Sequence, residues 1–405
     1  MQENVQNMLL MMKDTPVMRI NFDEVLYDVL DEFHLPYQLK GCIRKYEMKD
    51  NMTASEIQTA IKEAAIVGAK NNEAITRFLA QRVLPITREN AKKIYALFNF
   101  EQAQDDYSKA RIAVACRAVS LQDNYWIKLE NDPVTWKDVD IHQNHLNEIV
   151  AQVALHGTSL SLTGDPVTPE LTAFGAYAKA WQRKNDKLFL YKKGAKGDME
   201  AKIEVMVSDL LRKTNVNSLE YTSAKSEDCF VSKCECMTHD DIVMLSAMDF
   251  ESYCSRNGLN FMQEVQKIDA DSFYKMCIVD YLTANRDRHG MNWGFLYNCE
   301  TMQILGCHPL YDHNNAFDEE LMKNPDVPYL ALPSMTLRHA AQAAVKRTDF
   351  TFYEPIQRQD FLNDTQYRYF TSAAKELGLD LLSKQISPNN TKKMIEQFKE
   401  VEHDI

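Results

Sequence analysis

The sequence predicts an α+β protein in which an N-terminal α/β extension precedes a strand-rich lobe and then a helical lobe. Three observations predict it. A strand, a glycine-bearing turn and an amphipathic helix follow one another over residues 188–214. Helical patterns dominate from about residue 237, and a polar cluster separates a helix from a hairpin at residues 285–312. We therefore expect three parts, residues 1–150, 151–236 and 237–405.

The extension, residues 1–150, carries no pattern that indicates catalysis. Thr53-Ala54-Ser55-Glu56 has the form of a capping box, in which the first and fourth side chains satisfy backbone amides at a helix start. It opens the first of three expected helices, which cover residues 53–70, residues 73–83 and a segment from residue 87 onward. Residues 120–127 predict a turn that leads into a strand.

The strand-rich lobe contains the first candidate site residues. Residues 188–192 predict a strand that ends in Lys192, and residues 198–214 predict a helix with apolar side chains at i, i+3, i+4, i+7 and i+8. Glu204 lies at the edge of that apolar stripe. A strand lysine paired with a helix glutamate can direct the lysine at ATP phosphates. Strand alternation places Lys193 on the opposite face from Lys192, which favours Lys192.

A single glycine, Gly175, precedes this strand in the segment of residues 171–181. Glycine allows backbone amides to approach an anion, and Lys179 adds positive charge nearby. The sequence has no G-x-G-x-x-G run and no Walker motif.

The helical lobe contains the polar cluster. Asp287 and Asn292 have the D-x-x-x-x-N spacing of a kinase catalytic loop, and Asp312 follows after a predicted hairpin over residues 293–307. Phosphoryl transfer needs one carboxylate to orient the attacking hydroxyl, and an asparagine and a second carboxylate to hold Mg²⁺. The alternative is a turn whose Asp and Asn side chains cap helices.

These residues resemble the HipA family of bacterial serine/threonine kinases, in which a D-x-H-x-x-N loop precedes a P-x-Y-D metal motif. The resemblance implies a two-lobed protein-kinase-like fold that uses ATP and Mg²⁺. It assigns Lys192 and Glu204 to the phosphate-directing ion pair, Asp287 to the substrate hydroxyl, and Asn292 and Asp312 to the metal. It assigns His289 to the catalytic loop, where the ring is expected to bond backbone.

The resemblance also covers the nucleotide-binding segments. Gly175, Ala176 and Lys179 match a G-A-x-x-K core that covers the phosphates in HipA proteins. Some HipA kinases autophosphorylate a serine in this loop, but Ala176 and Ala178 offer no hydroxyl, so that regulation is not expected. The strand from residue 229 leads to the connection between lobes, which includes Lys233 and Glu235 and whose backbone would bond adenine.

Composition limits the class of protein. The net charge of −12 disfavours broad binding of nucleic acid, which needs a basic surface. No apolar run approaches the roughly 18 residues of a membrane span. Nine cysteines without framework spacing indicate reduced thiols in a cytoplasmic protein. One cluster offers four soft ligands that could hold zinc, namely Cys229, Cys234, Cys236 and His239. We favour the alternative that the cysteines are buried free thiols.

The expected function is an ATP- and Mg²⁺-dependent serine/threonine protein kinase of HipA type, a toxin or a regulatory kinase. Its expected partners are a protein substrate bearing Ser or Thr and an antitoxin or regulatory protein, with no nucleic acid and no membrane. One alternative is a lipid or small-molecule kinase of related fold, and another is a non-catalytic, partner-binding pseudokinase. A metal nuclease built on His289, Asn292 and His308 would lack paired carboxylates near the histidines.

Overall fold

The computed structural model describes residues 7–21, 26–44, 46, 51–158, 167–172, 175–195, 198–227 and 229–381. The chain forms two compact units. The first comprises Met1–Lys202, Ser223–Asp269 and His289–His308, and the second comprises Ile203–Thr222, Ala270–Arg288 and Pro309–Ile405. Both contain helices and antiparallel strands, so the predicted mixture of α and β structure is confirmed. The division into lobes at residues 150 and 236 stays a prediction.

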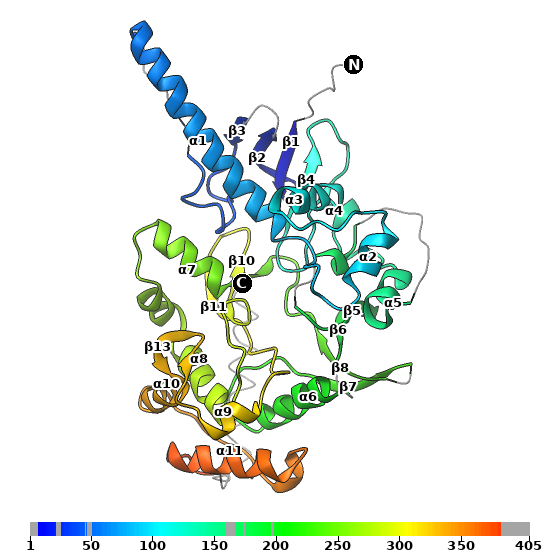
Figure 1. Cartoon of the computed structure of the whole chain (residues 1–405), viewed down its shortest axis with the longest axis vertical. Helices are drawn as coiled ribbons and strands as arrows, with labels where there is room; N and C mark the ends of the chain where they lie inside the picture. Colours follow the sequence, from blue (N-terminus) through cyan, green and yellow to red (C-terminus); the bar gives the residue numbers. More distant parts are fainter. Residues whose placement is uncertain are drawn as a thin grey trace, which may run out of the picture. The chain divides into compact units, whose positions relative to one another are not determined.

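The N-terminal part of the first unit is a four-stranded antiparallel sheet covered by helices (Figure 1, blue and cyan). The strands lie in the order β3-β2-β1-β4, with bounds β1 Met8–Met12, β2 Thr15–Asn21, β3 Leu26–Val29 and β4 Tyr125–Leu129. Its core includes Leu10, Met18 and Trp126, each at most 1% exposed. The helices of this part are α1 Ala54–Ala80, α2 Ala91–Leu97, α3 Asp106–Ala115, α4 Trp136–Val139 and α5 Glu148–His156.

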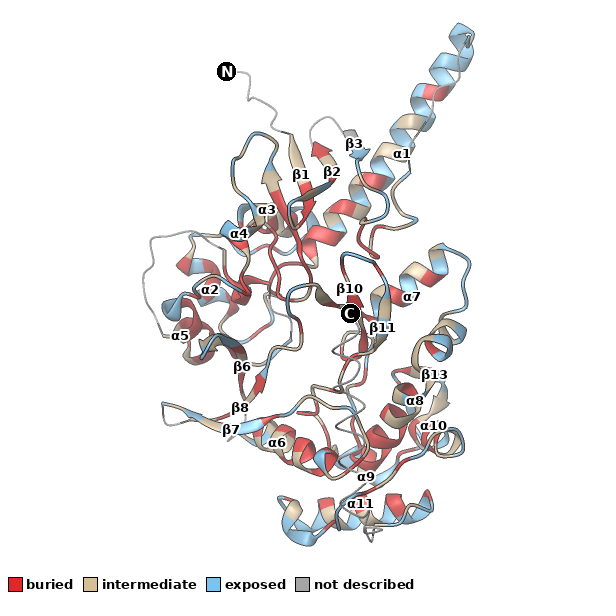
Figure 2. Ribbon diagram, turned by 180° about the vertical axis from the view of Figure 1, so that it is seen from behind, coloured by how far each residue is buried: buried red, intermediate tan, exposed pale blue. Residues whose placement is uncertain are grey.

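Helix α1 corrects the prediction of two separate helices over residues 53–70 and 73–83. The capping box at Thr53 and Glu56 is present, but the helix continues without a break to Ala80. Asn71, which lies between the two predicted helices, is buried and its side chain bonds both the amide and the carbonyl of Arg44. These two hydrogen bonds satisfy the side-chain amide of Asn71, so this polar residue can lie inside the helix. The first half of α1 is mostly exposed, as the pale blue in Figure 2 shows.

The helix expected from residue 87 starts later, at Ala91, because Asn90 has a left-handed backbone conformation with φ of 64°. The predicted turn into a strand at residues 120–127 is confirmed by β4.

A second antiparallel sheet in the first unit has the order β5-β6-β8-β7, and its strands are β5 Lys179–Lys184, β6 Lys187–Lys193, β7 Thr222–Ser226 and β8 Cys229–Glu235. The strands predicted at residues 188–192 and from residue 229 are confirmed as β6 and β8. The β5–β6 hairpin turns through Asn185 and Asp186, whose φ angles are both positive, as a type I′ turn requires. A short 3₁₀ helix, η1 Pro169–Leu171, precedes β5.

The third sheet of the first unit contains the predicted hairpin after residue 292. It has the order β11-β10-β9, with β9 Ile242–Ser246, β10 Gly294–Asn298 and β11 Ile304–Cys307. Gly294 is required here, because a Cβ would lie 2.2 Å from the carbonyl oxygen of Leu245 on β9. Helix α7, Ala247–Arg256, follows β9.

The second unit is largely helical. It includes residues 203–212 of α6 Met199–Arg212 and residues 270–282 of α8 Phe261–Leu282, which is interrupted by non-helical Asp269. The remaining elements are α9 Glu319–Lys323, β12 Pro328–Tyr329, β13 Leu332–Thr336, α10 Leu337–Ala344, η2 Arg358–Asp360 and α11 Asp364–Glu376. The sequence of residues 364–377 predicts a helix that stops at Gly378, and α11 confirms it. A last amphipathic helix is also expected over residues 390–401, which lie outside the described residues.

Two further observations bear on the class of protein. No helix in the described part of the chain is long and apolar enough to span a bilayer. All nine cysteines are free thiols, as the sequence predicted.

Candidate active site

Two candidate lysines of the first unit lie side by side on one face of the second sheet. Lys179 on β5 pairs directly with Lys192 on β6, and Lys192 pairs directly with Ser232 on β8. Directly paired residues point to the same face of an antiparallel sheet. Lys179 is 9% exposed and Lys192 is 5% exposed. Like charges directly opposite are unfavourable, so two buried lysines placed in this way need nearby negative charge.

Lys193 lies on the other face of the same strand. It pairs with Val231, and its backbone amide donates to the carbonyl of Ala178 at 2.9 Å. The strand register is therefore the one that the sequence predicted, with the buried Lys192 and the half-buried Lys193 pointing in opposite directions.

We expect Lys192→Met to weaken ATP binding about 10- to 100-fold, because a charged hydrogen-bond donor to a phosphate contributes roughly 1.5–3 kcal/mol. Lys193→Met serves as the matched control and should change ATP affinity less than about 2-fold. Titration of ATP by calorimetry measures both. Greater sensitivity at Lys193 would contradict the assignment.

Gly175 and Lys179 are directly associated. Gly175 has φ of +100°, and a Cβ there would lie 2.4 Å from the ammonium nitrogen of Lys179. The lysine side chain therefore passes over the glycine, which explains why a residue without Cβ stands four positions before Lys179. Ala176 is exposed beside it. The neighbouring Ala173 and Phe174 lie outside the described residues.

The two candidate residues at the end of β8 make contacts within their own sheet. The ammonium of Lys233 lies 3.8 Å from the ring centroid of Phe189. Glu235 is exposed and forms an ion pair of 2.9 Å with Lys187. Their predicted place in an adenine-binding connection stays a prediction.

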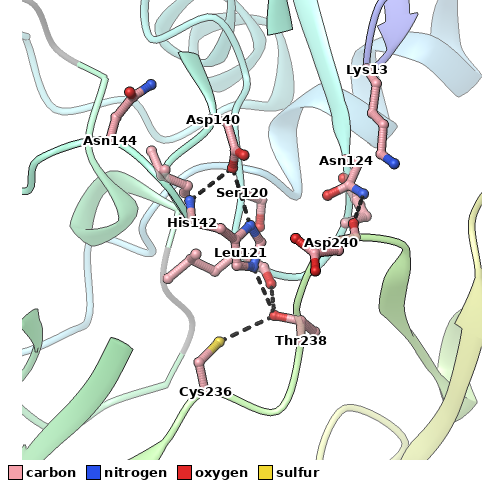
Figure 3. A network of polar contacts seen from close by, with 12 residues as sticks. Lys13, Ser120, Leu121, Asn124, Asp140, His142, Asn144, Cys236, Thr238 and Asp240 are labelled. Atoms are coloured by element: carbon pink, nitrogen blue, oxygen red, sulfur yellow. Dashed lines mark hydrogen bonds and ion pairs between the residues drawn. The ribbon is translucent and has the colours of Figure 1, made fainter. Parts of the chain in front are cut away.

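The chain after β8 is anchored to the N-terminal part of the first unit by a buried polar network (Figure 3). Thr238 donates from Oγ1 to the carbonyl of Leu121, and the same oxygen lies 3.2 Å from Nε2 of His142 and 3.2 Å from Sγ of Cys236. Burial lowers the pKa of His142, but hydrogen bonds with Asp140 and Cys236 outweigh it and raise the pKa to about 9. The imidazole is therefore protonated at neutral pH and holds this connection in place.

In the second unit, Asp287 is held by two asparagines. The side-chain amide of Asn315 donates to Oδ2 of Asp287 at 3.0 Å, and the backbone amide of Asp287 donates to Oδ1 of Asn285 at 3.2 Å. Asn285 in turn donates to Asp280, which is wholly buried. Asp287 is only half-buried. A fixed, half-exposed carboxylate of this kind can accept a hydrogen bond from a substrate hydroxyl.

Arg288 joins the segment of Asp287 to the segment of Asp312. Its side chain is 0% exposed and forms an ion pair of 3.0 Å with the equally buried Asp280. Its Nη1 donates to the carbonyl of Tyr311 at 2.8 Å. One buried guanidinium therefore fixes the residue after Asp287 against the residue before Asp312.

Asp312 has the backbone conformation of a constrained residue, with φ of 60°. Non-glycine residues adopt this region rarely, and Asp and Asn are among those that do so most often. Burial lowers the pKa of Arg288, but Asp280, Tyr329 and Asp312 outweigh it and raise the pKa above its ordinary value. The carboxylate of Asp312 is thus close enough to Arg288 to interact with its charge.

His289 and Asn292 belong to the first unit. The ring nitrogen Nδ1 of the exposed His289 accepts a hydrogen bond from the backbone amide of Met291 at 3.2 Å. The amide of Asn292 donates to the carbonyl of His289 at 2.8 Å, and Asn292 is 7% exposed. These bonds make residues 289–292 a closed turn that directs Asn292 inward.

Glu204, on the part of α6 that belongs to the second unit, is 1% exposed. The neighbouring positions Met206, Val207 and Leu210 are also buried, so the predicted apolar stripe is confirmed. A carboxylate this deeply buried requires a polar or charged partner. Its pairing with Lys192 stays a prediction.

The alternative of a zinc site is not supported. Among the described residues, the group of His, Cys, Asp and Glu side chains close enough to hold a metal is Asp241, Cys299 and Glu300, not the cysteines of β8. Lys13 already places its ammonium between Asp241 and Glu300.

Sequence reasoning missed three residues of this site, Arg288, Asp280 and Asn315. The one sequence signal was an Asp in the last turn of an otherwise apolar helix, Ile278-Val279-Asp280-Tyr281-Leu282. A charge there is costly unless it has a buried partner, and the partner is Arg288.

No protein-family model matches the sequence, and no curated protein matches it. Among solved structures, the proinflammatory kinase CtkA of Helicobacter pylori is similar, with 15% identity and a TM-score of 0.38 over 50% of this chain and 88% of that chain. The toxin–antitoxin protein HipA of Shewanella oneidensis MR-1, solved with HipB and operator DNA, shows 11% identity and a TM-score of 0.42 over 75% of this chain and 86% of that chain. Because both TM-scores are low, the assignment of function depends on the residues of this chain.

Proposed function

We propose that this protein is an ATP- and Mg²⁺-dependent kinase that transfers the γ-phosphate to a Ser or Thr hydroxyl of a protein. The observation that carries the proposal is the buried Arg288, which ties the Asp287 and Asp312 segments into one network. A structural turn does not need two constrained carboxylates on either side of one buried guanidinium. Phosphoryl transfer needs such a pair, one for the hydroxyl and one for the metal.

In this proposal, each candidate residue has a separate role. Lys179 and Lys192 bind phosphate oxygens from one face of the β5–β6 hairpin. Asp287 accepts the proton of the attacking hydroxyl or orients it, and Asn315 keeps the carboxylate in place. The acceptor as a Ser or Thr of a protein, and a regulatory partner of antitoxin type, rest on the resemblance of the motifs to the HipA family.

The residues present fit Mg²⁺. Asn292 and Asp312 offer an amide and a carboxylate oxygen, which are hard ligands that suit Mg²⁺ rather than zinc. The left-handed conformation of Asp312 is a strain that functional sites commonly retain. Mg²⁺, when bound, neutralises charge on the transferred phosphate.

Asp312→Asn tests the metal role without disturbing the backbone, since Asn also tolerates positive φ. We expect the tightening of ATP binding by Mg²⁺ to fall about 10-fold or more, because a charged ligand is lost. Calorimetric titration of ATP with and without Mg²⁺ measures it. Glu320→Gln, an exposed acid of the same unit, is the control and should leave the Mg²⁺ effect unchanged. A wild-type protein that binds ATP equally well with and without Mg²⁺ would contradict the proposal.

A further inference from the structure

The segment between α1 and α2 holds the loop that contains Gly175. In the first unit, the amide of Leu84 donates to the carbonyl of Leu171 at 2.6 Å, and the amide of Glu89 donates to the carbonyl of Ala176 at 2.9 Å. Both bonds link parts of the chain nearly ninety residues apart in sequence. The extension and the loop are therefore directly hydrogen-bonded to each other.

Arg88 closes the loop at its two ends. The side chain is 3% exposed, Nη1 donates to the carbonyl of Glu170 at 3.4 Å, and Nη2 donates to the carbonyl of Lys179. Glu170 lies just before the loop, and Lys179 is the first residue of β5, just after the loop. A single planar guanidinium thus fixes the separation of the two ends, which the flexible point charge of a lysine would not do.

The charge of Arg88 is retained despite its burial. Burial lowers the pKa of Arg88 to about 10, while the charges of Glu170 and Glu89 act in the opposite direction. The guanidinium is therefore protonated at neutral pH. Glu170 is itself 2% exposed and accepts hydrogen bonds from Thr168 and from the amide of Trp181, which anchors it at the start of the sheet. Burying a charge is costly unless hydrogen bonds and opposite charge compensate it, which the two carbonyls and Glu170 do here.

We infer that Arg88 is a positioning residue for nucleotide binding, and that the N-terminal extension is the support of the phosphate-binding loop. By holding the carbonyls of residues 170 and 179, Arg88 fixes the loop in the conformation in which Lys179 passes over Gly175. That this loop binds a nucleotide rests on the proposed function. That Arg88 orders the loop rests on the hydrogen bonds of its side chain.

Arg82 provides a matched control. It lies in the same extension, is 6% exposed, pairs with Asp123 through two nitrogens and donates to the carbonyls of Ala118 and Tyr125. Those partners lie in and before β4, away in sequence from residues 170–179. A purely structural role for Arg88 predicts that Arg88→Met and Arg82→Met behave alike. The positioning role predicts that they differ.

The experiment uses the full chain and two readouts. Hydrogen exchange of amides in residues 171–179 is measured without nucleotide, and Mg-ATP affinity and turnover are measured separately. We expect Arg88→Met to accelerate exchange in this segment and to raise Kd and KM for ATP about 10-fold or more, with kcat at saturating ATP changed less than about 3-fold. Arg82→Met should lower Tm without a selective effect on the segment or on ATP. Arg88→Lys keeps the charge but loses the planar guanidinium that donates to two carbonyls at once. Its exchange rate and its Kd for ATP should lie between those of wild type and Arg88→Met.

The outcomes separate the two proposals. Suppose that wild type binds ATP, and that Arg88→Lys and a folded Arg88→Met have the same exchange rate in residues 171–179 and the same Kd for ATP as wild type. The inference about Arg88 is then overturned, while the proposed function stands. If wild type binds no ATP, the proposed function fails, and the exchange data alone then decide whether Arg88 orders the loop. If Arg88→Met does not fold, the comparison of Arg88→Lys with Arg82→Lys decides it, and equal exchange in the two overturns the inference.

Discussion

Asp287→Asn is expected to lower phosphoryl transfer about 10²–10⁴-fold, the contribution of a positioned general base. The substitution keeps the size of the side chain but removes its ability to take a proton. ATP affinity should change little, because Asp287 is assigned to the hydroxyl and not to the nucleotide. Initial rates at saturating ATP, together with the Kd for ATP, measure both effects.

Asn315→Ala is the companion variant. It removes the amide that donates to Asp287 and leaves the carboxylate intact, so activity should fall by less than in Asp287→Asn. Near-wild-type transfer by Asp287→Asn would remove Asp287 from the site and, with it, the interpretation of the polar turn as a catalytic loop.

The second large effect is on stability. Arg288→Met should reduce the free energy of unfolding by about 3–5 kcal/mol, because it leaves the carboxylate of Asp280 buried without its positively charged partner. Urea unfolding measures it. Arg286→Met, two residues away on an exposed side chain, is the control and should cost less than about 1 kcal/mol.

The double variant Arg288→Met with Asp280→Leu separates stability from activity. It should regain part of the lost stability, since no lone charge stays buried, although Asn285 and Tyr329 lose the acceptor that Asp280 provides. It should still fail to transfer phosphate, because the carbonyl of Tyr311 loses the donor that places it. A double variant that is both stable and fully active would show that Arg288 has a purely structural role.

Local patterns predicted the elements around the site well. The strand that ends in Lys192, the helix that bears Glu204 and the hairpin after Asn292 all follow from alternation, helical periodicity and turn residues, and β6, α6 and β10–β11 confirm them. These signals lie within about ten residues of sequence, where backbone propensity and patterning act.

Contacts between distant segments could not be predicted in the same way. The sequence predicted two helices where α1 is continuous, and it gave no sign that Asn71 between them would bond the backbone of Arg44, 27 residues away. Nothing local in the sequence reveals that Arg288 and Arg88 are each buried against carbonyls from another segment. Buried polar groups are satisfied by tertiary partners, and those partners are invisible in a single sequence.

The measurement that tests the central claim most directly is incubation of the purified protein with γ-labelled ATP and Mg²⁺, with and without cell lysate, followed by mass spectrometry of the labelled species. The proposed function predicts label on Ser or Thr of a protein, dependent on Mg²⁺ and lost in Asp287→Asn. Absence of transfer to any acceptor, with no binding of Mg-ATP by the folded protein, would contradict it. Label on a lipid or a small molecule instead would retain the kinase chemistry and overturn the assignment of a protein substrate.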